Sequence, residues 1–289
     1  MQLVIESLSK RYPNGTQALS DLSLSITPGM FGLLGPNGAG KSTFMRTLAT
    51  LQEADSGSAR FGNLDVLRDK DGMRRILGYL PQEFGLYAKE RAEDLLLHFA
   101  TLKGITRPKE RRDSVNALLE QTNLWEHRRK PLGSFSGGMK QRFGIAQALL
   151  GNPQVIIVDE PTAGLDPEER VRFHNLLASI GEHVIVILST HIVSDVSDLC
   201  SQMAIVNKGR VLLTGEPAAL VEKLHGRVWR RFIEHNEADA FRSRYRVISM
   251  RLSGGKTSVR ILSDSDPGDG FVAATADLED LYFSSIDSK

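Results

Sequence analysis

The sequence Gly35-Pro36-Asn37-Gly38-Ala39-Gly40-Lys41-Ser42-Thr43 satisfies the pattern G-x-x-x-x-G-K-[ST], and a short apolar run, Met30–Leu34, comes directly before it. A helical pattern from Lys41 to about Leu51 follows it. Glycines let backbone N–H groups converge on phosphate oxygens, and the start of a helix adds the positive end of its dipole. We expect the whole stretch to bind nucleotide phosphates, with Lys41 at the β- and γ-phosphates and the Ser42 hydroxyl on Mg²⁺. The alternative is an ordinary glycine-rich turn.

A second apolar run ends in two carboxylates. Val155–Val158 is followed by Asp159 and Glu160. Ligands of open α/β sheets bind at the carboxyl ends of the strands. We therefore expect Asp159 to hold Mg²⁺ and Glu160 to orient or deprotonate an attacking water. The alternative is that the two acids cap the next helix or stay in solvent, but capping does not explain why they end an all-apolar strand.

The first 215 or so residues alternate between strand-like and helix-like patterns. Leu22–Ile26 alternates with period two, which is typical of a half-buried strand. Val155–Val158 and Val184–Leu188 are continuous apolar runs, which suit a parallel sheet covered on both faces. Between them, Pro167–Ile180 has helical apolar spacing and a proline in its first turn. These patterns predict an α/β fold with parallel crossovers.

Two other parts of the chain have a different pattern of apolar and polar residues. The segment Tyr87–Gly133 has helical periodicity and no convincing strand, so we predict a helical subdomain over about 87–150. After Leu224 the pattern changes again, and we predict a main domain over 1–224 and a small C-terminal α/β domain over 225–289 that docks on it. The elements expected in this last part are strands Arg227–Ile233, Tyr245–Leu252 and Lys256–Leu262 and helices Glu237–Arg242 and Asp277–Phe283.

The composition limits the classes of function. With 289 residues, 41% of them apolar and 25% charged, the chain is typical of a soluble globular protein of one or two domains. A net charge of +1 gives no electrostatic case for a nucleic-acid partner. The single cysteine excludes an internal disulfide and a cysteine-based zinc site. No apolar run approaches the roughly 18 residues that cross a bilayer, and no signal pattern opens the chain. We expect a cytosolic protein whose membrane part, if any, is another chain.

A third motif points to a family. Ser136-Gly137-Gly138-Met139-Lys140-Gln141-Arg142 resembles the signature motif of ATP-binding cassette (ABC) ATPases, and residues 1 to about 224 resemble the nucleotide-binding subunit of an ABC transporter. The resemblance implies a P-loop NTPase fold that uses ATP and Mg²⁺, with Lys41 and Glu160 in catalysis. It also implies roles for Tyr12 stacked on adenine, Gln82 as the catalytic and Mg²⁺-binding glutamine of the Q-loop, Ala163-Gly164-Leu165-Asp166 as the D-loop with Asp166 at the nucleotide, and His191 as the switch histidine.

The signature motif also predicts a partner. A serine and two glycines before a helix that begins near Met139 make a second anion-binding helix N-terminus. The resemblance implies that Ser136, Gly137 and Gly138 bind the γ-phosphate of ATP held by the phosphate loop of a second subunit, identical or paralogous, arranged head to tail. Phe135 and Met139 replace the family's usual leucine and glutamine, which puts the packing of this helix in doubt but not the serine or the glycine amides.

Each residue taken from the resemblance has a simpler interpretation. Tyr12 could be a strand-edge aromatic, because stacking on adenine needs only a π-face. Gln82 could be a surface amide, and His191 a cap of the following helix. The segment Glu83–Tyr87 is expected to be an exposed patch, which in the resembled transporters receives the coupling helix of the membrane subunit; alternatively it folds onto the helical subdomain.

Three basic clusters also leave two interpretations open. They are His127–Lys130, Arg227–Arg231 and Arg242–Arg246, and we expect them to be solvated. The alternative is that one of them lies near anionic lipid head groups.

Taken together, the sequence predicts the ATP-hydrolysing subunit of an ABC transporter. Its expected partners are ATP, a second ATPase subunit and separate transmembrane permease subunits, and its expected place is the cytoplasmic face of the membrane. The single cassette and short C-terminal part resemble exporters of drugs, lipids or polysaccharides. The alternatives are an importer ATPase, although sugar importers usually carry a larger regulatory domain, and a soluble ABC ATPase outside transport. A P-loop kinase or GTPase would have no use for Ser136-Gly137-Gly138.

Overall fold

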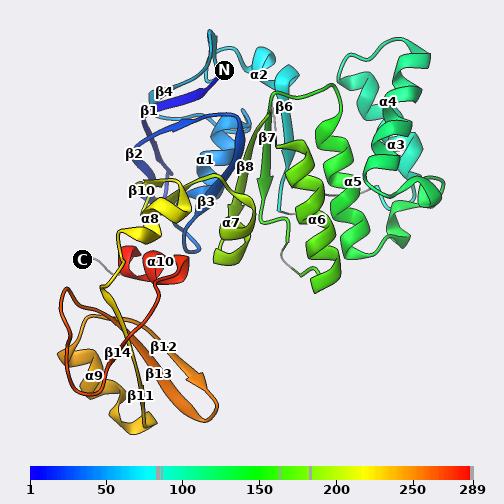
Figure 1. Cartoon of the computed structure of the whole chain (residues 1–289). Helices are drawn as coiled ribbons and strands as arrows, with labels where there is room; N and C mark the ends of the chain where they lie inside the picture. The colour runs from blue at the N-terminus through cyan, green and yellow to red at the C-terminus, as the bar shows by residue number, and fades with distance from the viewer. Residues whose placement is uncertain (83–84, 86, 163, 182–183, 287–289) are drawn as a thin grey trace.

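The computed structural model describes residues 1–82, 85, 87–162, 164–181 and 184–286 (Figure 1). The strands are β1 (Leu3–Arg11), β2 (Gln17–Ile26), β3 (Gly29–Leu34), β4 (Ser56–Phe61), β5 (Leu64–Asp65), β6 (Leu77–Leu80), β7 (Val155–Asp159), β8 (Ile185–Thr190), β9 (Gln202–Asn207), β10 (Arg210–Gly215), β11 (Val228–Ile233), β12 (Val247–Ser253), β13 (Lys256–Leu262) and β14 (Val272–Ala273). The helices are α1 (Lys41–Leu48), α2 (Lys70–Ile76), α3 (Ala92–Leu102), α4 (Pro108–Gln121), α5 (Gly137–Leu149), α6 (Pro167–Ile180), α7 (Val193–Leu199), α8 (Pro217–Glu222), α9 (Ala238–Arg244) and α10 (Leu278–Ile286).

The central sheet has the strand order β10-β9-β3-β8-β7-β6, and only its edge strand β10 runs antiparallel to its neighbour. Alternate residues of a strand face opposite sides of the sheet. In β3, Phe31 and Leu33 accordingly lie in one hydrophobic core, whereas Met30 and Leu34 lie in another. The continuous apolar runs are thus buried on both faces, as predicted, and the α/β fold is confirmed.

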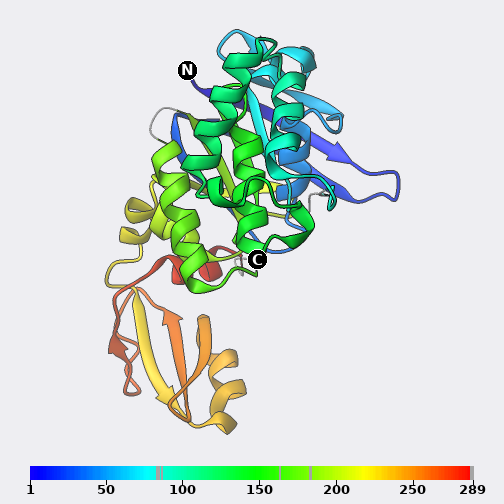
Figure 2. The ribbon, with the colours of Figure 1, turned by 90° about the vertical axis from the view of Figure 1, so that its right-hand side faces the viewer.

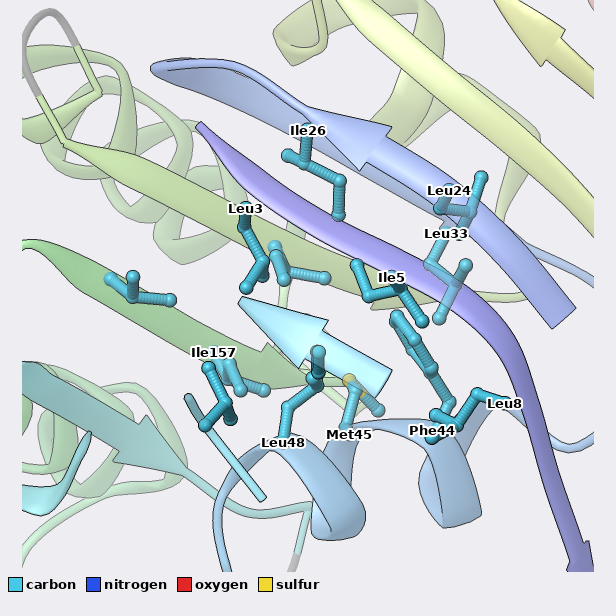
Figure 3. Packing of buried hydrophobic residues seen from close by; sticks show 14 of the residues in the cluster. Leu3, Ile5, Leu8, Leu24, Ile26, Leu33, Phe44, Met45, Leu48 and Ile157 are labelled. Carbon is cyan, nitrogen blue, oxygen red and sulfur yellow. The ribbon is translucent and has the colours of Figure 1, made fainter. Parts of the chain in front are cut away.

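The first core lies between the central sheet and an antiparallel sheet of order β2-β1-β4-β5. Figure 3 shows Phe44, Met45 and Leu48 of α1 pointing toward side chains of β1. Of this second sheet, the sequence predicted only part of β2. The pattern of β1 is irregular because its pairing with β2 shifts register between Ile5 and Leu8, where Ser7 has a left-handed backbone (φ 49°), so its apolar residues do not alternate strictly.

The helices α3, α4 and α5 surround a third core and form the side of the molecule that is drawn in green in Figure 1. Their buried residues include Leu96, Leu119 and Phe143. As expected, helices dominate 87–133. The strand-like pairing within its described residues is an isolated bridge between Arg91 and Pro131. The helix that carries the signature motif, α5, starts at Gly137 rather than near Met139, because Ser136 already caps it.

The C-terminal part has its own antiparallel sheet, of order β12-β13-β11-β14, which projects from the rest of the molecule (Figures 1 and 2). The last helix, α10, does not belong to that sheet alone. Leu281 and Tyr282 are buried in the second hydrophobic core, together with Met203 of β9. On its other side, Asp280, only 2% exposed, accepts a hydrogen bond of 2.7 Å from Arg260 Nε of β13. The helix therefore packs on the central sheet and is tied to the C-terminal sheet.

Candidate nucleotide site

The phosphate loop leaves β3, in the interior of the central sheet, and leads into α1. Gly40, at the N-terminus of α1, has φ 104°, and a Cβ atom there would lie 2.4 Å from the backbone oxygen of Ala18. Both observations require glycine at this position. The helix ends at Leu48, earlier than expected, and Thr50 follows with a left-handed φ of 61°. The strand–loop–helix unit predicted by the sequence is present.

A pocket of about 410 Å³ opens beside this loop. Three residues from other parts of the chain, Tyr12, Gln82 and Glu160, line it together with Asn37–Thr43. The remaining lining residues are Thr16 and Ala18. The structure thus brings three residues to the phosphate loop although they lie far apart in the sequence. They are Tyr12, predicted to stack on adenine, Gln82 of the predicted Q-loop, and Glu160, the predicted general base.

Lys41 is held inside the loop. Its side-chain nitrogen donates to the backbone oxygens of Gly35, at 2.6 Å, and Pro36, at 3.2 Å. Burial lowers the pKa of Lys41, whereas the nearby carboxylates of Glu160 and Asp159 raise it. A phosphate bound beside this ammonium would stabilise its charged form and would therefore oppose the effect of burial on the pKa of Lys41.

Tyr12 contacts α1 through its hydroxyl group. The hydroxyl lies 3.1 Å from Thr43 Oγ1 and donates to Gln52 Oε1 at 3.2 Å. Gln52 Nε2 in turn donates to the backbone oxygen of Thr43 at 2.9 Å. These bonds hold the tyrosine at the edge of the pocket. Gln52 belongs to no local motif, so its place at the pocket could not be predicted from the sequence.

Asp159 fits a magnesium site. It is 4% exposed, and among the described residues its Oδ1 atom has no hydrogen-bond partner. Burial raises the pKa of the Asp159 carboxyl, and the hydroxyls of Ser189 and Ser42 lower it in part. Mg²⁺ commonly takes only one or two protein ligands and fills its shell with water and phosphate oxygens. An unpaired carboxylate oxygen near the Ser42 hydroxyl matches that donor set.

Glu160, Gln82 and His191 meet at the carboxyl ends of β7, β6 and β8. Glu160 Oε2 accepts a hydrogen bond from Gln82 Nε2 at 3.2 Å and lies 3.3 Å from His191 Nδ1. The Glu160 side chain is 12% exposed and that of His191 48%. Glu160 has a left-handed backbone, φ 47°, and its N–H donates to the Ser189 oxygen at 2.9 Å. Three predicted catalytic side chains are therefore in contact.

The signature and D-loop residues lie outside this pocket. Ser136 and Gly137 are exposed, and Ser136 Oγ accepts from Met139 N at 3.2 Å as the N-cap of α5. Gly138 is buried against Glu169 of α6. Asp166 caps α6 by accepting from Glu169 N at 2.8 Å, and Ala163 lies outside the described residues. Within one chain the signature motif therefore lies apart from the phosphate loop.

Phe135 and Met139, the two departures from the usual signature, contribute to the core of the helical part. Phe135 is 4% exposed there, and Met139 packs against the same core while partly buried. The aromatic side chain is thus accommodated without displacing Ser136 from its capping position.

Of the expected surface patch, Glu83, Phe84 and Leu86 lie outside the described residues, and Tyr87 is 65% exposed. Among the described residues, no helix combines the length and apolar character that crossing a membrane requires.

Acidic or aromatic groups accompany several of the basic side chains. Arg128 stacks over Trp125 at 3.7 Å from the ring centroid. The other pairs are Arg227 with Asp264, Arg242 with Asp239 and Arg244 with Asp269. These contacts favour the interpretation of the clusters as ordinary solvated surface.

Comparison with known proteins agrees with this geometry. A family model described as ABC transporter matches residues 19–163. The "Probable multidrug ABC transporter ATP-binding protein YbhF" of Escherichia coli (strain K12) is 36% identical over 228 residues, 78% of this chain and 39% of that protein. This chain therefore spans less than half the length of YbhF.

Two further matches cover more of the related protein. The "Uncharacterized ABC transporter ATP-binding protein YxlF" of Bacillus subtilis (strain 168) is 37% identical over 215 residues, 74% of this chain and 70% of that protein. The ATP-binding cassette MJ0796, solved as a dimer in a post-hydrolysis state with ADP and Pi, superposes with a TM-score of 0.67 at 25% identity, over 74% of this chain and 98% of that one. With its phosphate loop, paired strand-end carboxylates and signature helix, the chain belongs to the ABC transporter family as an ATP-binding cassette.

Proposed function

We propose that this chain hydrolyses ATP and couples the hydrolysis to a separate transmembrane permease. The observation that carries the proposal is the contact of Glu160 with Gln82 and His191 beside the phosphate-loop pocket. A carboxylate that lines a phosphate pocket and is oriented by two further side chains is the arrangement a general base needs. Residues 1–224 form the ATPase domain in this proposal, and residues 225–289 form an accessory part.

The side chains of the pocket have separate roles in the proposed reaction. Lys41 and the loop amides bind the phosphates, and Tyr12 receives the adenine. Mg²⁺, held by Ser42, Asp159 and Gln82, would neutralise charge on the phosphates. Glu160 orients the attacking water and accepts its proton, and His191 holds the Glu160 carboxylate and contacts the γ-phosphate.

The proposal includes a dimer. Ser136 and Gly137 present an exposed helix N-terminus outside their own pocket, which is available to the ATP of a second subunit. The related cassette MJ0796 was solved as a dimer. The second subunit is an identical chain or a paralogue.

The permease is proposed to bind beside the helical part. A pocket of about 410 Å³ there is mostly apolar and is flanked by Leu51, 57% exposed, and Leu102, 71% exposed. Phe99 and Tyr79 also line it. Exposed apolar groups around a groove suit an apolar protein segment. This docking would hold the chain at the cytoplasmic face of the membrane, and the multidrug name of YbhF favours export.

The test of the ATPase is Glu160→Gln, which keeps the shape and one hydrogen-bonding oxygen but cannot accept a proton. Phosphate release should fall by roughly 10²- to 10⁴-fold, whereas ATP binding, measured by equilibrium dialysis with Mg·ATP, should stay within about twofold of wild type. Normal hydrolysis by this variant would remove Glu160 from the mechanism, and a wild-type protein without ATP hydrolysis would contradict the proposed function itself.

A further inference from the structure

A buried carboxylate outside the nucleotide pocket holds together the segments that carry Glu160 and His191. Asp195, in the first turn of α7, is 0% exposed. Its Oδ2 atom accepts hydrogen bonds from Thr162 Oγ1 at 2.7 Å and from Thr190 Oγ1 at 3.1 Å. Asp195 could not be predicted from the sequence, because a lone aspartate in a short helix has no motif.

The other oxygen of this carboxylate faces α6. Asp195 Oδ1 accepts from Arg170 Nε at 2.9 Å and lies 3.0 Å from His174 Nε2. The Arg170 guanidinium compensates the charge, which a buried carboxylate requires. Asp195 therefore has donors on both oxygens, two from catalytic segments and two from α6.

The two threonines lie next to the catalytic residues in the chain. Thr162 comes two residues after Glu160 and is 4% exposed, and Thr190 directly precedes His191 and is 1% exposed. Thr190 Oγ1 also accepts from Ile192 N at 2.9 Å, so its hydroxyl is bonded to two residues that follow the histidine. One carboxylate is thus hydrogen-bonded to both of the segments that carry the catalytic side chains.

We propose that Asp195 is a positioning residue for ATP hydrolysis, acting through the hydroxyls of Thr162 and Thr190. It keeps the Glu160 carboxylate within 3.3 Å of the His191 ring, a contact made by two loops from adjacent strands. Directional hydrogen bonds do this where apolar packing would leave the loops free to slide. The inference rests on the proposed function, because it assigns a role in the same reaction.

The test compares two substitutions at each threonine. Thr162→Val and Thr190→Val keep the side-chain shape but remove the hydroxyl, whereas Thr162→Ser and Thr190→Ser keep the hydroxyl. The valine variants should lose roughly 10- to 100-fold in kcat, the effect of a displacement of about 1 Å at a reacting group. Their KM for ATP should stay within about twofold, because the phosphate loop and Tyr12 lie on other segments. The serine variants should retain kcat.

A control at the opposite side of the carboxylate separates positioning from stability. His174→Ala removes one of the two α6 side chains that contact the carboxylate and leaves Arg170 in place, so it should lower the melting temperature while kcat stays within about twofold. Equal losses of kcat in His174→Ala and the valine variants would overturn the proposal, as would serine variants that are as slow as the valine variants. Valine variants that fail to fold would also overturn it, since the bonds would then serve the fold.

A double variant distinguishes a failure of this inference from a failure of the proposed function. When Thr162→Val is added to Glu160→Gln, the residual rate should not fall further, because the group to be positioned is already lost. A further loss of tenfold or more would show that Thr162 acts elsewhere and overturn the inference. A wild-type protein that does not hydrolyse ATP would instead contradict the proposed function.

Discussion

Tyr12 carries two separable features, an aromatic ring and a hydroxyl that is bonded to Thr43 and Gln52. Only the ring is needed for stacking on adenine, because any π-face can stack on a base. The hydroxyl instead links Tyr12, which directly follows β1, to Thr43 of α1. Two substitutions can therefore assign the role of each part.

If the ring stacks on adenine, Tyr12→Phe should bind Mg·ATP nearly as well as wild type, and Tyr12→Ala should lose about 1–3 kcal/mol of binding free energy. Titration calorimetry with ATP and with inorganic triphosphate measures the difference. Triphosphate, which has no base, serves as the control and should bind both variants alike. Equal weakening of ATP binding by Phe and Ala would assign the effect to the hydroxyl and not to stacking.

The residues of the site differ in how far a sequence reveals them. Local sequence patterns indicate the chemistry of Lys41, Asp159 and Glu160. The structure places these three residues around one pocket or directly beside it. Gln52 and Asp195 could not be predicted. Each acts through hydrogen bonds to residues far away in the chain, and such bonds exist only once the sheets are assembled.

The signature helix α5 begins with an exposed Ser136 and Gly137. Apart from the adjoining residues and the backbone of the same helix, no described atom lies within 4 Å of the position of a Cβ at Gly137. A side chain can therefore be added there without disturbing the chain's own packing. A substitution at Gly137 can therefore test whether α5 binds the nucleotide of a second subunit without an effect on the fold of this chain.

In the Glu160→Gln background, Mg·ATP should produce a dimer, and Gly137→Asp should abolish it by placing bulk and negative charge against the γ-phosphate. Gly137→Ala is the matched control and should still dimerise. Size-exclusion chromatography with light scattering gives the masses. A dimer that tolerates Gly137→Asp would contradict the head-to-tail arrangement.

Regular elements of the central sheet were predictable for a physical reason. Strands such as β7 and β8 are buried on both faces, so their apolar runs are unbroken. The antiparallel sheet is different, because β1 contains register shifts and β4 has several polar residues. Its strands depend on partners from distant segments, which no local pattern records.

At the level of the molecule, the second hydrophobic core extends across the expected boundary near residue 224. Leu220, Val228, Ile248 and Leu281 all belong to it. Every residue that lines the nucleotide pocket lies before this boundary. The C-terminal part should therefore contribute to stability and leave ATP affinity unaltered.

Leu281→Ala, at a side chain that is 5% exposed, should lower the free energy of unfolding by about 2–5 kcal/mol. Leu252→Ala, the same substitution at a side chain that is 76% exposed, should change it by less than about 0.5 kcal/mol. Urea titration measures both, and ATP affinity should be equal in the two variants. Equal stability of the two variants would mean that α10 does not complete the core.

Association with a membrane should depend on the proposed permease. We expect the protein to sediment with membranes when its permease is coexpressed and to stay in the supernatant otherwise, because no described helix can span a bilayer and many basic side chains are already paired. Permease-free vesicles of anionic lipid are the control. Salt-sensitive binding to those vesicles would instead identify a direct lipid contact.

The position of α10 in the chain also sets the order in which contacts of the second core form during synthesis. Residues 278–286 leave the ribosome after every strand of the central sheet, yet they cover apolar surface of β9 and its neighbours. Until they emerge, that surface remains open to other chains, and exposed apolar surface on a nascent chain favours aggregation and chaperone binding. All residues that line the nucleotide pocket are therefore synthesised before α10, and this apolar surface of the central sheet is covered only once α10 packs on it.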